Sequence, residues 1–185
     1  KPAAERDLEE LLDAKKRHSG SDEINPWDMA FYIERLQREK FQLSDEELRP
    51  YFRLESVIQG VFEHARRLYG IEFRERKDIP VYHADVRAFE VVEASSGRFM
   101  AYFYADFFPR ASKRGGAWMT NFLEQGTWAG KVCRPHVSIV CNFTKPSTTQ
   151  PSLLSLMEVR TLFHEFGHAL HSLLTDCQYA TIAGT

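Results

Sequence analysis

The sequence predicts an α+β fold, because helical and strand-like patterns occupy separate stretches of the chain. Helical spacing of apolar residues dominates residues 1–70, segments rich in Val, Phe and Tyr follow over 71–150, and one amphipathic helix occupies 151–175. The 185 residues, 43% of them hydrophobic, are enough for a core. We therefore expect residues 1–185 to form a single continuous segment. Because the sequence starts on Lys1 without a Met and stops at Thr185 in mid-flow, we expect this segment to belong to a longer chain.

Composition excludes two classes of partner. The formal net charge is −2 and the Lys and Arg residues are spread along the chain, so no basic face for nucleic acid or an anionic membrane is expected. No apolar stretch reaches the ~18–20 residues of a membrane span. The three cysteines form an odd, irregular set, which favours buried free thiols and the cytoplasm; a removed signal peptide would leave the periplasm as an alternative.

Two helices are predicted near the amino terminus. Residues 5–18 carry leucines at helical spacing and end at Ser19-Gly20-Ser21. Asn25-Pro26 is typical of a helix start, and we expect a second helix from there to about Lys40, with Trp27, Ala30 and Phe31 on one face.

A short turn and a third helix are expected next. Ser44 and Glu47 fit a capping box for a turn that Pro50 closes. The following helix ends at Gly70, and its core stripe is predicted to comprise Leu54, Val57, Ile58, Val61, Phe62, Ala65 and Leu68.

Strands are predicted after residue 70. Residues 86–93 and 98–107 form a β-hairpin around Ser95-Ser96-Gly97, and residues 136–143 form a third strand that Lys145-Pro146 ends. The paired glycines Gly115-Gly116 indicate a flexible segment between the hairpin and the third strand.

The last helix is predicted to begin near Ser152 or Ser155, the latter forming a capping box with Glu158, and to run to about Leu174. Apolar residues at steps of three and four predict the core face, which comprises Leu156, Val159, Phe163, Phe166, Leu170 and Leu173. Every histidine of this helix lies off that stripe.

The pattern His164-Glu165-Phe166-Gly167-His168 predicts a metal site on this helix. His164 and His168 are four residues apart, so their rings can converge on one zinc ion as two of its tetrahedral ligands. Glu165 is rotated about 100° from His164, beside the metal on the solvent or cleft side, where it can accept a proton from an activated water molecule. The sequence therefore predicts Glu165 as a general base and one Zn²⁺ as cofactor.

Two neighbouring residues need separate interpretation. Gly167 costs roughly 1 kcal/mol of helix propensity against Ala, so another segment or a substrate comes close there, unless packing explains it. His171 shares the face of the histidine pair, but seven residues of helix rise ~10.5 Å, too far from His164 for a shared tetrahedral ion.

Several motifs together resemble the thimet oligopeptidase family of zinc peptidases, and within it the bacterial peptidyl-dipeptidase (dipeptidyl carboxypeptidase) branch. The specific motif is the run from Thr161 to His171 around His164-Glu165-Phe166-Gly167-His168. Supporting motifs are Cys141-Asn142-Phe143 with Lys145-Pro146, the run Lys113-Arg114-Gly115-Gly116-Ala117-Trp118, and the loop from Tyr179 to Thr185.

The resemblance implies a mainly α, two-lobed zincin-type peptidase whose channel admits short unfolded peptides, from which it releases C-terminal dipeptides. It implies that residues 1–185 are part of the catalytic domain and that the third zinc ligand is a Glu beyond Thr185, so the chain alone would be inactive. The strand at 136–143 would lie along the bound peptide. The loop after the helix would close over the far side, with Tyr179 and Gly184 as substrate-side residues.

Alternatives remain open. Cys133 and His136 have a Cys-x-x-His spacing that could start a second zinc site, but no second pair accompanies them. A non-catalytic peptide-binding or scaffold domain could keep the helix for packing and a residual metal for stability. The sequence leaves the oligomeric state open.

Overall fold

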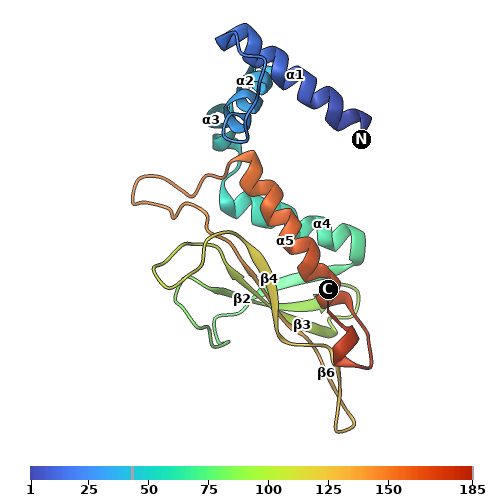
Figure 1. Ribbon diagram of the computed structural model, residues 1–185. Helices are drawn as coiled ribbons and strands as arrows, with labels where there is room; N and C mark the ends of the chain where they lie inside the picture. The colour runs from blue at the N-terminus through green and yellow to red at the C-terminus, as the bar shows by residue number, and fades with distance from the viewer. Residues whose placement is uncertain (43, 185) are drawn as a thin grey trace. The chain divides into compact units, whose positions relative to one another are not determined.

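The computed structural model describes residues 1–42 and 44–184 (Figure 1). The chain divides into two compact units, the first comprising Lys1–Leu48 and the second beginning at Arg49. None of the helices in the described residues combines the length and apolar character that crossing a membrane requires. The last residue of the predicted substrate-side loop, Thr185, lies outside the described residues.

The first unit contains helices α1 (Pro2–Ser19), α2 (Met29–Phe41) and α3 (Asp45–Leu48). Gly20 adopts a left-handed conformation with φ 72° and ends α1, as its sequence predicts. A small core of Leu11, Ala14 and Tyr32 joins α1 to α2. The predicted capping box is present, because the Glu47 amide donates to Ser44 Oγ and the Ser44 amide donates to the Glu47 carboxylate.

The predicted start and face of α2 are wrong. The helix begins at Met29 and not at Pro26, because the Asp28 carboxylate accepts the Asn25 amide and the Lys15 ammonium and holds residues 26–28 in a turn. Trp27 and Phe31 are 79% and 53% exposed within this chain, whereas Tyr32 is buried. Contact with α1 therefore decides the buried face.

The second unit begins with a 3-10 turn, η1 (Arg49–Tyr51), which includes Pro50 instead of ending at it. Two long helices follow at distant points of the sequence, α4 (Leu54–Tyr69) and α5 (Leu156–Leu174). A short antiparallel bridge fastens their amino-terminal ends together: the Leu54 amide donates to Ser152 O at 3.0 Å, and the Leu154 amide donates to Phe52 O at 2.8 Å. Gly70 ends α4 in the left-handed conformation, as predicted.

The second unit also contains a mixed five-stranded sheet with the order β1-β2-β3-β7-β4. Its strands are β1 (Ile71–Glu75), β2 (Arg87–Glu93), β3 (Phe99–Asp106), β4 (Trp118–Leu123) and β7 (His136–Val140). Strands β3 and β7 are parallel, and all other neighbours are antiparallel. The predicted hairpin is β2–β3. A separate two-stranded hairpin comprises β5 (Gly126–Trp128) and β6 (Lys131–Cys133).

Helices α4 and α5 pack on one face of the five-stranded sheet (Figure 1). Phenylalanine rings from both helices and the sheet form the centre of this core. Phe166 of α5 lies 5.5–6.0 Å, centroid to centroid, from the rings of Phe62, Phe73 and Phe103. The sheet thus fixes the rotation of α5 about its axis.

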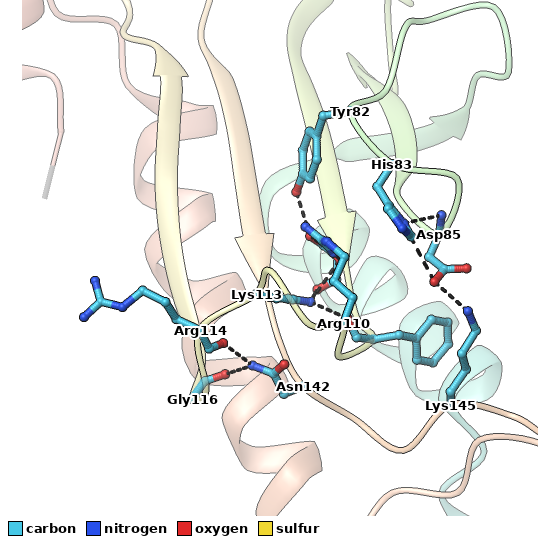
Figure 2. A network of polar contacts seen from close by, with 11 residues as sticks. Tyr82, His83, Asp85, Arg110, Lys113, Arg114, Gly116, Asn142 and Lys145 are labelled. Atoms are coloured by element: carbon cyan, nitrogen blue, oxygen red, sulfur yellow. Dashed lines mark hydrogen bonds and ion pairs between the residues drawn. The ribbon is translucent and has the colours of Figure 1, made fainter.

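A buried ion cluster lies at the carboxyl end of β3 (Figure 2). Asp106, with no exposed surface, accepts hydrogen bonds from Tyr82 Oη, Arg110 Nη1 and Lys113 Nζ, each at 2.9 Å. The Lys113 ammonium also donates to the carbonyls of Asp106 and Phe108. These bonds hold the loop from Arg110 that leads into β4.

Candidate metal centre

Helix α5 begins where the sequence predicts, with a complete capping box. The Glu158 amide donates to Ser155 Oγ at 3.1 Å, and the Ser155 amide donates to Glu158 Oε2 at 2.7 Å. These bonds satisfy amides that the first helical turn leaves without partners. These bonds therefore fix the first residues of the helix. They also fix the rotational position of every later side chain about the helix axis.

The predicted core face of α5 is partly wrong. The residues that are buried are Leu162, Glu165, Phe166, Ala169, Ser172 and Leu173. Leu156 and Phe163, which the sequence places on the core stripe, are exposed within this chain. The buried face is thus rotated about the helix axis toward Leu162 and Ala169, because it must fit both α4 and the sheet.

The two predicted metal ligands converge. His164 and His168 are exposed on the face away from the core, with their Nε2 atoms 3.2 Å apart and their rings at 86° to each other. Two ligands at about 2.0–2.1 Å from a tetrahedral zinc ion stand roughly 3.3–3.4 Å apart. The separation of the two Nε2 atoms therefore suits two of the four ligands of such an ion.

Glu165 does not lie on the solvent side, which is one of the two environments that the sequence allows. Its side chain is only 7% exposed, because the buried face includes its position. It lies close enough to the buried Cys141 to act on its thiol: burial raises the pKa of Cys141 to about 12, and the negative charge of Glu165 adds to this effect. The carboxylate therefore lies on the flank of α5 that faces the end of β7.

His171 and Gly167 line a surface depression of about 540 Å³ on the other flank of α5. Its wall also includes Tyr69, Leu170, Leu174 and Ile182. A Cβ atom added to Gly167 would meet nothing within 4 Å, so packing inside the described residues does not explain this glycine. No group of three or more His, Cys, Asp or Glu side chains suited to a metal ion occurs in the described residues.

The predicted substrate-side residues lie on the loop after α5. Tyr179 is 64% exposed and precedes the 3-10 turn η2 (Ala180–Ile182), and Gly184 lies beside Glu124, just beyond β4. In the part of the chain that the structure describes, no hydrogen bond or ring contact joins either residue to the histidine pair.

The strand predicted at 136–143 is not an edge strand of the described sheet, so a bound peptide cannot pair with β7 along a free edge. β7 lies inside the sheet, hydrogen-bonded to β3 on one side and β4 on the other. The edge strand on this side of the described sheet is β4, and α5 packs against both β4 and β7.

The second predicted pair, Cys133 and His136, has no further ligand in the described residues. The His136 ring packs edge-on against Tyr102 at 5.0 Å, and burial lowers the pKa of its imidazole. Packing of the ring against Tyr102 explains the position of His136.

Sequence reasoning missed Arg134, which binds the end of the site helix. Its guanidinium donates to Leu173 O and Thr175 O, each at 3.2 Å, and to Gln125 Oε1 at 2.7 Å. A cation at a helix carboxyl terminus satisfies free carbonyls and the helix dipole. No local pattern could have identified it, because its two acceptors at the end of α5 lie about 40 residues away in the sequence.

Known proteins match the whole chain. Peptidase family M3 matches residues 1–185. Dipeptidyl carboxypeptidase of Escherichia coli is 50% identical over 170 residues, which cover 91% of this chain and 24% of that protein. Oligopeptidase A of the same organism is 42% identical over 185 residues, 100% of this chain and 27% of that protein.

A more distant relative is the probable thimet oligopeptidase of Arabidopsis thaliana, 29% identical over 180 residues that cover 97% of this chain and 25% of that protein. The chain spans about a quarter of the length of the curated relatives it matches. The resemblance drawn from the motifs of the sequence is thereby confirmed, and the chain belongs to Peptidase family M3.

Proposed function

We propose that this chain is a segment of the catalytic domain of a zinc metallopeptidase and supplies two metal ligands and the general base. The observation that carries the proposal is the 3.2 Å separation of His164 Nε2 and His168 Nε2, with Glu165 next to His164 on the same helix. The bound cofactor would be one Zn²⁺ ion.

The chemistry follows from these residues. Zinc, when bound, polarises the peptide carbonyl and makes a water molecule easier to deprotonate. His164 and His168 hold the ion through Nε2. The Glu165 carboxylate takes a proton from the water that attacks the scissile carbonyl and delivers it to the leaving amine nitrogen. Its low exposure keeps that proton away from bulk solvent.

The third protein ligand of the zinc ion would come from outside this chain. Catalytic zinc sites have three protein ligands and one open position, and this helix supplies two of the three. We place the third, a Glu, on a helix beyond Thr185 of the complete, two-lobed enzyme. The chain alone is therefore inactive.

The substrate is a short unfolded peptide. Release of C-terminal dipeptides is favoured over internal cleavage, because the chain is 50% identical to a dipeptidyl carboxypeptidase and 42% identical to an oligopeptidase A. An extended peptide can add to the edge strand β4, beside which α5 packs. Tyr179 and Gly184 would then lie near one end of that edge, since Gly184 adjoins Glu124. The cytoplasm suits the three free cysteines.

The test replaces the general base in the complete enzyme. Glu165→Gln keeps the size of the side chain and removes the proton acceptor, so hydrolysis of a short peptide should fall roughly 10²–10⁴-fold while the zinc content stays unchanged. Glu158→Gln is the matched control on the same helix, because Gln also fits the third position of a capping box. Undiminished turnover in Glu165→Gln would remove Glu165 from this role. A wild-type enzyme that binds zinc and peptide without cleaving would indicate the scaffold alternative.

A further inference from the structure

The β5–β6 hairpin lies directly against the loop that follows α5 (Figure 1). The Thr127 amide donates to Gln178 O at 2.9 Å, so the first strand of the hairpin extends its hydrogen bonding to this loop. A Cβ atom built on Gly126 would lie 3.0 Å from Ala180 N and 3.1 Å from Ala180 Cβ. Any side chain at this position would therefore require Ala180 to move by a few tenths of an ångström, whereas glycine allows the close approach of the two backbones.

Residues flanking the hairpin hold the start of the same loop. Gln125 is buried, donates from Nε2 to Cys177 O and accepts from Arg134 Nη1. Arg134 in turn donates to Leu173 O and Thr175 O. The end of α5 and the first residues after it are therefore bound to both sides of the hairpin.

The far end of the loop lies beside the end of β4. Gly184 packs beside the Glu124 carboxylate, which accepts from Asn121 Nδ2 at 2.7 Å. Asn121 Nδ2 also donates to the buried Ser172 Oγ of α5 at 3.1 Å. Between the two ends of the loop, Tyr179 and Ile182 remain exposed.

We propose that the β5–β6 hairpin is a clasp that positions the loop at 175–184 for peptide binding, with Gly126 as its positioning residue. The role of this loop in binding peptide rests on the proposed function, whereas the clasp itself rests on the contacts above. Gly126 acts through Ala180 and touches neither the histidine pair nor Glu165 in these contacts. Displacing the loop should therefore weaken peptide binding and leave the chemical step unchanged.

The test is Gly126→Ala in the complete enzyme. The φ angle of Gly126 is outside the left-handed region, so Ala fits the strand, and the added methyl group can only push Ala180 away. Gly60→Ala in α4 is the matched control, because its added Cβ meets nothing within 4 Å. We expect Gly126→Ala to raise KM about tenfold with kcat nearly unchanged. Zinc content should not change, and amide hydrogen exchange should rise across residues 175–184.

Two results would overturn the clasp. In one, Gly126→Ala matches wild type in KM and in exchange at 175–184; in the other, kcat and zinc content fall together, which would mean that the hairpin supports the metal site. If Gly126→Ala does not fold, Arg134→Lys tests the same inference, because it keeps the charge and loses the planar fork that reaches Leu173 O at the end of α5 and Thr175 O at the start of the loop. The exchange measurement needs no activity, so a wild-type enzyme without turnover would refute the proposed function and leave the clasp testable.

Discussion

Replacing Asp106 by Asn is expected to destabilise the second unit strongly. The substitution keeps the shape of the side chain and removes its charge. Asp106 has no exposed surface, and its partner Lys113 has a side chain that is only 2% exposed. The Lys113 ammonium would lose the negative charge that it faces and would be left with uncharged acceptors, among them the carbonyls of residue 106 and Phe108.

The size of the effect follows from this burial. Removing one partner of a buried ion pair costs about 3–5 kcal/mol, because the remaining charge stays desolvated. Asp85→Asn is the matched control. Asp85 pairs with Lys145 at 2.7 Å, but the Lys145 side chain is 56% exposed, so its loss should cost about 0–1 kcal/mol.

Two measurements compare the variants. Equilibrium unfolding in urea gives the free energy of unfolding, and amide hydrogen exchange gives the local stability. The Cys141 amide donates to Asp106 O and the Phe143 amide to Phe107 O, each at 2.8 Å, so these two amides report directly on the end of β3. We expect Asp106→Asn to lower the free energy of unfolding by several kcal/mol and to speed exchange at both amides. If Asp106→Asn costs no more than Asp85→Asn, the cluster does not hold this part of the fold.

Three further predictions concern acid stability, the core face of α5 and the isolated chain. Burial alone would raise the pKa of Asp106, but hydrogen bonds from Lys113, Arg110 and Tyr82 outweigh it and lower the pKa, so the unfolded chain takes up the proton first. The stability advantage of wild type over Asp106→Asn should hold above the ordinary aspartate pKa of about 3.9 and shrink as the pH falls below it; an advantage independent of pH would contradict this. Phe166→Ala should cost about 3–5 kcal/mol in urea unfolding and Phe163→Ala clearly less, because Phe166 is buried among rings and Phe163 is 39% exposed; equal losses would restore the stripe predicted from sequence. The zinc-loaded chain of residues 1–185 should hydrolyse short peptides no faster than buffer, and turnover well above buffer would show that no further ligand is needed.

Local signals in the sequence predicted the ends of helices well. Gly20 and Gly70 end α1 and α4, and the pair of Ser155 and Glu158 begins α5, because each acts on backbone groups within a few residues of itself. The spacing of His164 and His168 predicted their convergence for the same reason, since one helical turn brings the two rings together.

Features that depend on distant partners could not be predicted. α5 has apolar residues around much of its circumference, and packing against α4 and the sheet decides that Leu162 is buried and Leu156 exposed. The sequence identified β7 as a strand but not its place inside the sheet. The neighbour that makes β7 an interior strand is β4, and β4 lacks the clear alternation of apolar residues that would predict a strand. The buried position of Glu165 follows from the same packing.

The most direct test of the proposed metal centre is the zinc content of histidine variants of the complete enzyme. His164→Gln and His168→Gln each remove one of the two converging Nε2 ligands, so each should lose zinc under conditions in which wild type holds one ion per molecule. His171→Gln is the control, because its ring lies about 10.5 Å along the helix from His164 and should leave the zinc content unchanged. Full zinc in either ligand variant, or loss of zinc in His171→Gln alone, would contradict the account.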